Sequence, residues 1–269
     1  MPGIGTLRGP SILEKIMRCP HCSAENPVNS SRCRTCGLDR TSPLIWPHLP
    51  AYAVRKLGVV AAAAVAVCSL LAVVAGALSF ESLWLARLGA AQRDPGLVER
   101  AHRLEEGLLR AEGVAMLVAG VLVIAWFSRA RRNLDAFPEA RPSISAGWAI
   151  GGWLVPFAHF VLPYRIMKQI AAASLRGRAT GRLVGWWWGA YLVGMLTTRL
   201  MRRLRPDGGF PAHVEYFVRM REVQLVAAVA MVAAGVLLVR LIVLISGAQT
   251  DRIARARAAR SLSGARLGG

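Results

Sequence analysis

Five stretches of the chain contain no Asp, Glu, Lys or Arg, and they constrain the fold more than any other feature of the sequence. About 20 helical residues cross the hydrocarbon layer of a bilayer, at roughly 1.5 Å per residue. Two of the stretches reach that length alone, and the others need flanking cations whose side chains extend to the interface. The sequence therefore predicts an all-α, polytopic bundle of about five transmembrane helices. The stretches cover residues 57–80, 113–128, 142–164, 183–198 and 223–239.

Four of the five cysteines lie ahead of these stretches, in "CPHCSAENPVNSSRCRTCG". Two C-x2-C pairs, ten residues apart, can direct four thiolates at one point, which is the tetrahedral shell that zinc accepts. A closed shell predicts a structural zinc whose binding folds the segment. His21 is not needed as a ligand, and Gly37 suits the backbone reversal after the second pair. The alternative, two disulfides, is less favoured because secreted modules usually carry a signal peptide and more cysteines. The predicted ligands are Cys19, Cys22, Cys33 and Cys36.

The segments around these features predict the domain organisation. The linker carries Pro43, Pro47 and Pro50, which predict an extended, semi-rigid spacer. Met17 directly precedes "RCPHC", so translation starts at either Met1 or Met17. The predicted segments are an N-terminal extension (1–18), a zinc ribbon (19–38), a Pro-rich linker (39–55), a membrane domain (56–250) and an Arg-rich tail (251–269).

The formal charge of +19 comes from 34 basic and 15 acidic residues. In a membrane protein this excess predicts anionic lipid headgroups, rather than nucleic acid, as the partner of the basic loops. Cations before residue 57 and at 129–132 predict a cytoplasmic N-terminus and ribbon. The number of crossings stays open. Five crossings, favoured by the length of 142–164, place the C-terminus outside, whereas four, favoured by the tail arginines, place both ends inside.

The third stretch, "WAIGGWLVPFAHFVLPYR", contains Pro156, which removes a backbone donor and disturbs the carbonyl of Gly152. The simpler interpretation is a kinked, packed helix with His159 bonded to a nearby backbone carbonyl. The other is a broken or re-entrant helix that lines a polar cavity, with His159 as ligand or proton-sensitive group. His159 and Arg240 are thus the candidate intramembrane polar residues, although Arg240 is expected to extend to the interface or to pair within the bundle.

Local patterns predict the remaining elements. Asp94 and Pro95 predict an N-cap and first residue of a helix that continues into the second stretch. Trp186, Trp187 and Trp188 point around about 200° of a helix, which favours an interfacial belt. The last helix is expected from near Pro211 to about residue 248.

Three ordered motifs carry a resemblance to a known family: "WFSRARRNL", "GWAIGGWLVPFAHFVLPYRIMKQI" and "GWWWGAYL". They resemble the bacterial membrane family catalogued as domain of unknown function 4328, over roughly residues 56–250. The resemblance implies a multi-helix membrane domain without an established activity, in the cell membrane of mostly high-GC Gram-positive bacteria. Where that family has asparagine after the first proline, this chain has His159, which weakens a role built on the histidine alone.

The sequence also limits the function. None of the 15 acidic residues lies in the five stretches, and there is no P-loop, HExxH or GxSxG motif, so we expect no enzyme. The leading hypothesis is a membrane anchor or scaffold whose cytosolic ribbon binds a protein partner. The alternative is a small-solute or lipid-handling protein that uses the Pro-broken third stretch.

Overall fold

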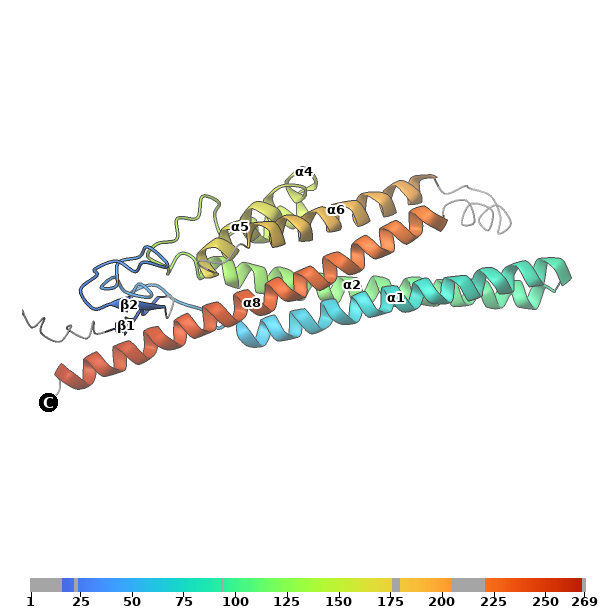
Figure 1. Cartoon of the computed structure of the whole chain (residues 1–269). Coiled ribbons are helices and arrows are strands. Elements are labelled where there is room, and N and C mark those ends of the chain that lie inside the picture. The colour runs from blue at the N-terminus through green and yellow to red at the C-terminus, as the bar shows by residue number, and fades with distance from the viewer. Residues whose placement is uncertain (1–15, 22–23, 93, 176–179, 205–220, 268–269) are drawn as a thin grey trace, which may run out of the picture.

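A computed structural model describes residues 16–21, 24–92, 94–175, 180–204 and 221–267 (Figure 1). Helices dominate these residues and strands are confined to the N-terminal region, so the predicted all-α membrane class is confirmed. The elements are β1 (Ile16–Arg18), β2 (Glu25–Pro27), α1 (Arg55–Gln92), α2 (Pro95–Arg132), α3 (Trp148–Leu154), α4 (Pro156–His159), α5 (Leu162–Ser174), α6 (Gly181–Leu204) and α8 (Arg221–Leu267). Cys22 and the expected start of the last helix near Pro211 lie outside the described residues.

Three described helices are long and apolar enough to cross a membrane: Arg55–Leu78, Glu106–Arg132 and Glu222–Ser261. Their most apolar windows are only 22%, 11% and 22% buried, so most of their apolar side chains face outward, as lipid requires. α6 has 24 residues and runs alongside α8 (Figure 1). The predicted cap is confirmed, because Asp94 accepts a hydrogen bond of 2.8 Å from the backbone N–H of Gly96.

Small residues let α1 approach its neighbours closely. A Cβ atom on Gly58 would meet Ser246 of α8, and it would lie 3.2 Å from Nε1 of Trp126 in α2. A Cβ on Gly235 of α8 would likewise meet Ser69 of α1. Packing through small residues is the usual basis of helix association in lipid.

The third apolar stretch is broken and turns back on itself. Val155 is extended (φ −85°, ψ 121°) between α3 and α4, and Pro156 begins α4. A Cβ on Gly152 would lie 3.0 Å from Cβ of Leu162, and Gln169 donates a 2.8 Å hydrogen bond to Ser143. These pairs place α3 beside α5 as an antiparallel hairpin. The continuous third crossing that the length of 142–164 favoured is therefore not formed, because the break at Val155 reverses the chain.

The two ends of this hairpin lie at the same end of the bundle as the strands and the last part of α8 (Figure 1). The carbonyl of Ile144, before α3, accepts from the guanidinium of Arg131 in α2, and Ser174, at the end of α5, accepts from Gln249 in α8. We call residues 16–42, which contain the strands and the cysteine pairs, the ribbon, and this end of the bundle the ribbon end. The largest buried side chains concentrate there, among them Trp126, Phe127, Phe137, Trp187, Met167 and Ile245.

Three local predictions are corrected by the packing. The segment predicted as a spacer joins the core, because Leu44, Ile45 and Val54 are buried in the same hydrophobic cluster as the bundle. α8 continues to Leu267 instead of ending near residue 248, since Ile253 and Ala256 are buried in that cluster. The predicted tryptophan belt is wrong for two of its three members: Trp186 is exposed, but the helix turns Trp187 and Trp188 into the core.

Candidate functional site

The sulfur atoms of Cys19, Cys33 and Cys36 all lie within 4.8 Å of one another. The two sulfurs of Cys19 and Cys36 are 3.8 Å apart, well beyond the length of a disulfide bond, about 2.05 Å. A tetrahedron with zinc–sulfur bonds of about 2.3 Å has edges of about 3.8 Å. The three described cysteines are therefore close enough to hold a metal ion, while the fourth predicted ligand, Cys22, lies outside the described residues.

Backbone hydrogen bonds position the cysteines. β1 pairs antiparallel with β2, Arg18 opposite Glu25, and this places Cys19 directly after β1. The N–H of Cys19 then donates to the carbonyl of Ala24 at 2.8 Å, across the first cysteine pair. In the second pair, the N–H of Gly37 donates to the carbonyl of Cys33 at 2.8 Å. Gly37 has a φ of +70°, so the predicted need for glycine at this reversal is confirmed.

Asn26 supports the metal centre and was not identified from the sequence. Its side chain is buried in β2, and its Nδ2 donates to the sulfur of Cys33 at 3.2 Å and to the carbonyl of Ala24 at 3.0 Å. Its Oδ1 accepts from the N–H of Arg34 at 2.7 Å. An amide donor stabilises a thiolate and so favours metal binding. In the sequence, Asn26 is one of several polar residues between the cysteine pairs, and only the inward face of β2 distinguishes it.

His21 lies beside the metal centre but contacts the surrounding protein. Its ring Nε2 lies 3.3 Å from Oγ of Ser42, and its carbonyl accepts from Arg255 of α8 at 3.4 Å. Nearby, hydrogen bonds from the side chain and the N–H of Thr41 hold the pKa of Asp39 below its usual value. The contact of His21 with Arg255 shows that the ribbon lies against α8.

Arg252 of α8 holds both the linker and the segment after α2. Both guanidinium Nη atoms of Arg252, in α8, pair with Glu139, at 2.5 and 2.9 Å. The Nε of Arg252 donates to the carbonyl of Leu44 at 2.8 Å, and its guanidinium lies 3.9 Å from the ring centre of Phe137. The side chains of Arg252 and Glu139 are 6% and 19% exposed. We call these contacts of Arg252 the clasp.

A second polar network lies beside the clasp. The amide of Asn133 forms reciprocal hydrogen bonds with the backbone of Tyr52, at 2.7 and 3.0 Å, and it also donates to Gln249 at 2.8 Å. Gln249 donates in turn to Ser174 at 3.0 Å and to the carbonyl of Ala130 at 3.2 Å. Asn133 and Gln249 are fully buried. The network therefore joins the linker, α2, α5 and α8, which are distant in sequence.

His159 lies in the hairpin and forms two polar contacts. Its Nδ1 is 3.3 Å from the carbonyl of Trp153, which agrees with the predicted bond to a backbone carbonyl. Its Nε2 is 2.9 Å from the hydroxyl of Tyr191 in α6, and Trp188 and Phe160 also pack against the imidazole. Arg240 is exposed on α8, and no hydrogen bond or ion pair in the described part of the chain joins it to His159. The two candidate intramembrane residues therefore do not form one site.

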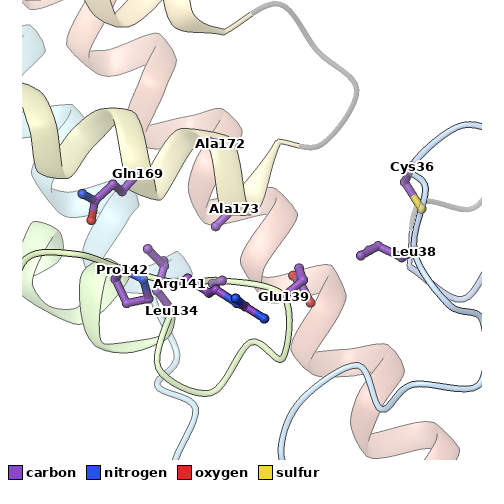
Figure 2. Close-up of a pocket in the computed structure, with 10 residues that line it drawn as sticks. Cys36, Leu38, Leu134, Glu139, Arg141, Pro142, Gln169, Ala172 and Ala173 are labelled. Carbon is purple, nitrogen blue, oxygen red and sulfur yellow. The ribbon is translucent and has the colours of Figure 1, made fainter.

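A cavity of about 360 Å³ separates the ribbon from the bundle. Figure 2 shows Cys36 and Leu38 of the ribbon on one side of this cavity and the segment 139–142 together with α5 on the other. The cavity is large enough for part of a small ligand.

The comparisons with known proteins concern the membrane part. A family model described as "Domain of unknown function (DUF4328)" matches residues 89–247, from the end of α1 to α8. The match starts later than residue 56, where the resemblance was expected to begin. It leaves the ribbon and most of α1 outside. No curated protein and no solved structure matches the chain. Because the matched residues are more than half of the sequence, the chain belongs to the DUF4328 family.

Proposed function

We propose that this protein is a non-enzymatic membrane scaffold: the helix bundle anchors a cytosolic zinc ribbon, and the ribbon binds a protein partner. The observation that carries the proposal is the position of the ribbon. It is held against α8 through its first cysteine pair, while its β-hairpin remains exposed.

Zinc is the metal that the site fits best. Four cysteines with the C-x2-C spacing are a typical zinc ligand set, and the separation of the Cys19 and Cys36 sulfurs equals a tetrahedral edge around this ion. A shell of four thiolates has no position for water or substrate, so the metal stabilises the ribbon.

Cations support a cytoplasmic orientation of the ribbon end, in a bacterial cell membrane as the family resemblance implies. Exposed cations surround the bundle at this end and outnumber its described carboxylates, those of Asp135, Glu139 and Asp251, of which the first two pair with Arg131 and Arg252. An excess of Lys and Arg marks the cytoplasmic side of membrane helices, and it also attracts anionic lipid headgroups. The exposed cations are Arg55, Lys56, Arg129, Arg132, Arg141, Arg165, Lys168 and Arg182.

The exposed face of the β-hairpin indicates the kind of partner. Ile16, Met17 and Val28 are 65%, 48% and 38% exposed. A cavity of about 510 Å³ lies beside Met17 and Val28 and is also lined by Arg18 and Arg40. Apolar side chains next to cations favour a protein segment that combines apolar and acidic residues.

Site-specific photo-crosslinking in native membranes tests this proposal with the full chain. A photoreactive amino acid at Met17 should give a defined crosslinked product, and Ile16→Asp should abolish it. The same amino acid at Thr35, an exposed ribbon residue in the second cysteine pair, is the matched control. A crosslink from Thr35 but none from Met17, or a Met17 product unaffected by Ile16→Asp, would contradict the proposed surface.

The broken third stretch favours a second candidate function, the handling of a small solute or lipid. The specific observation is the polar contact of His159 with Tyr191 within an apolar hairpin. Flux and lipid-transfer rates in liposomes should fall at least severalfold in His159→Ala if the histidine takes part. Equal rates for both proteins would remove His159 from this function.

A further inference from the structure

The cavity between ribbon and bundle is lined by both apolar and polar side chains. Ala172 and Ala173 of α5, together with Leu134 and Pro142, provide most of the apolar lining on the side of the bundle. Arg141, Gln169 and Glu139 provide the polar groups. Figure 2 shows Gln169, Pro142 and Arg141 on the side away from Cys36 and Leu38. A ligand in this cavity therefore meets apolar and charged groups at once.

The charge available to a ligand is positive. The two carboxylate oxygens of Glu139 already accept hydrogen bonds from Arg252 in the clasp. Arg141, by contrast, is exposed and forms no hydrogen bond or ion pair with another residue in the described ranges. Arg165 and Lys168 are also exposed, one helical turn before Gln169 and Ala172, and residues four apart share a face of a helix. Three cations thus lie in or next to the cavity, and none of them forms an ion pair with an acidic side chain among the described residues.

The position of the cavity brings it near lipid headgroups. It opens beside the base of the α3–α5 hairpin, where Ser143 bonds to Gln169. The tip of that hairpin carries exposed apolar side chains, among them Leu154 and Phe157, which suit a lipid environment. The hairpin therefore leads from apolar surface at its tip to cations at its base.

We propose that this cavity binds an amphiphilic anion, that is, a carboxylate or phosphate attached to an apolar chain. The anionic group pairs with Arg141, and the adjoining apolar part rests against Ala172 and Leu134. Two sources share this chemistry: the headgroup of an anionic phospholipid and a free fatty acid. The proposal does not depend on the protein partner of the ribbon.

Spin-label electron paramagnetic resonance tests the proposal, because the motionally restricted fraction of a labelled lipid reports its association with the protein. The full chain is placed in nanodiscs of phosphatidylcholine with a trace of labelled phosphatidylglycerol, fatty acid or phosphatidylcholine, each carrying the nitroxide at the same chain position. We expect at least one of the two anionic probes to associate about fivefold more strongly than phosphatidylcholine, the size of effect that one cation near an anionic lipid provides. The anionic probe that shows this preference identifies the source, and equal association of all three probes would overturn the proposal.

Three variants separate the cavity from the general charge of this end. Arg141→Gln should remove most of the preference, whereas Arg132→Gln, an exposed arginine that does not line the cavity, should leave it within about 1.5-fold. Ala172→Trp fills the cavity and keeps every charge, so it should also remove the preference. Equal losses in Arg141→Gln and Arg132→Gln, or a preference unchanged in Ala172→Trp, would overturn the proposal. Zinc content and circular dichroism identify any variant that fails to fold. If Arg141→Gln fails to fold, Arg141→Lys, which keeps the charge, replaces it. The lipid preference of Arg141→Lys should stay near the wild-type value, and a complete loss would count against a charge-based site.

Discussion

The ribbon and the helix bundle are stabilised by opposite means. The ribbon has two strands of three residues each, and its buried side chains are mainly cysteines, His21 and Asn26, too few for a hydrophobic core. The bundle has long helices whose apolar side chains mostly face outward, as expected in lipid. A metal therefore has to hold the first region, whereas close packing holds the second. The comparison teaches that the two regions can be destabilised separately.

The ribbon and the bundle meet in a zone that is held neither by a metal nor by apolar packing alone. The buried polar side chains described beyond the ribbon belong to the parts of α2 and α8 nearest the ribbon or to Asn133, the C-cap of α2. They are Ser128, Arg131, Asn133, Ser246, Gln249 and Arg252. Polar groups buried together must satisfy one another, and this requirement fixes their geometry. The clasp and the Asn133 network thus fix the linker, through Leu44 and Tyr52, to the bundle.

Removal of the metal should have the largest effect and should separate the two regions completely. Zinc binding provides about 10–16 kcal/mol of apparent free energy in small zinc domains, so Cys33→Ser or a strong chelator should unfold the ribbon. Trypsin should then cleave rapidly after Arg34 and Arg40. The helix content of the bundle, measured by circular dichroism in detergent, should change little.

Cys68→Ser is the matched control for this experiment. Cys68 lies in α1, far in sequence from the ribbon, and the substitution should keep one zinc per chain by elemental analysis. Collapse of the helical signal together with the ribbon would show that the regions are not independent.

Breaking the clasp should have the next largest effect, and it tests the joint itself. Arg252→Met keeps an unbranched, largely apolar stem but removes the guanidinium that pairs with the largely buried carboxylate of Glu139. Loss of one member of a buried ion pair typically costs about 3–5 kcal/mol. Because Glu139 is 19% exposed, we expect the lower end of this range. A fall in melting temperature in detergent, with zinc still bound, would measure it.

Arg257→Met provides the control in the same helix. Arg257 is exposed, so its loss should change the free energy of unfolding by no more than about 0.5 kcal/mol. If both variants melted alike, the clasp would contribute no more than a surface charge.

Loss of the hydrogen bond from Asn26 to the sulfur of Cys33 should have a smaller effect, which is confined to metal binding by the ribbon. Asn26→Ala removes the amide that donates to the sulfur of Cys33, and such outer-shell losses typically weaken metal binding about 10- to 100-fold. Asn29→Ala, an exposed asparagine in the same turn region, should leave the affinity unchanged. Competition with a chromogenic chelator measures both, and equal affinities for the two variants would exclude a role for Asn26.

Sequence patterns predicted the membrane class, the cysteine cluster and the Asp94 cap because each depends on local spacing or composition. They predicted the third stretch less well. Its length favours a crossing, whereas its path depends on whether the chain reverses after Pro156, which in turn depends on contacts such as Gly152 with Leu162. Whether a tryptophan lies in an interfacial belt or in the core likewise depends on whether a neighbouring segment covers it. The hairpin covers Trp188, whose indole N–H donates to the carbonyl of Phe160 at 3.1 Å.

The clasp could not be predicted from the sequence for the same reason. Arg252 lies in an Arg-rich segment that resembles a solvated tail, and its partner Glu139 is 113 residues away. Nothing local distinguishes it from exposed Arg257. Because pairing between distant residues depends on the packed fold, the charge of a segment indicates its composition but not which of its cations are buried.

Helix packing within the bundle provides the last and smallest test, and it affects the bundle while sparing the ribbon. A methyl group added in Gly58→Ala would meet Ser246 and would lie 3.1 Å from its Cβ, so rotation of the hydroxyl alone cannot relieve the contact. It would also disturb the 2.9 Å hydrogen bond from Trp126 to Ser246. Overpacking of this kind typically costs about 1–3 kcal/mol.

Gly76→Ala in the same helix has no neighbour within 4 Å and should be neutral or stabilise by up to about 1 kcal/mol. Melting temperatures in detergent should therefore fall for Gly58→Ala alone, with the zinc content of both variants unchanged. The double variant Gly58→Ala, Ser246→Ala should recover part of the loss, since it removes the hydroxyl that the new methyl group would meet. Equal melting temperatures for the two single variants would mean that α1 and α8 are not in close contact at Gly58.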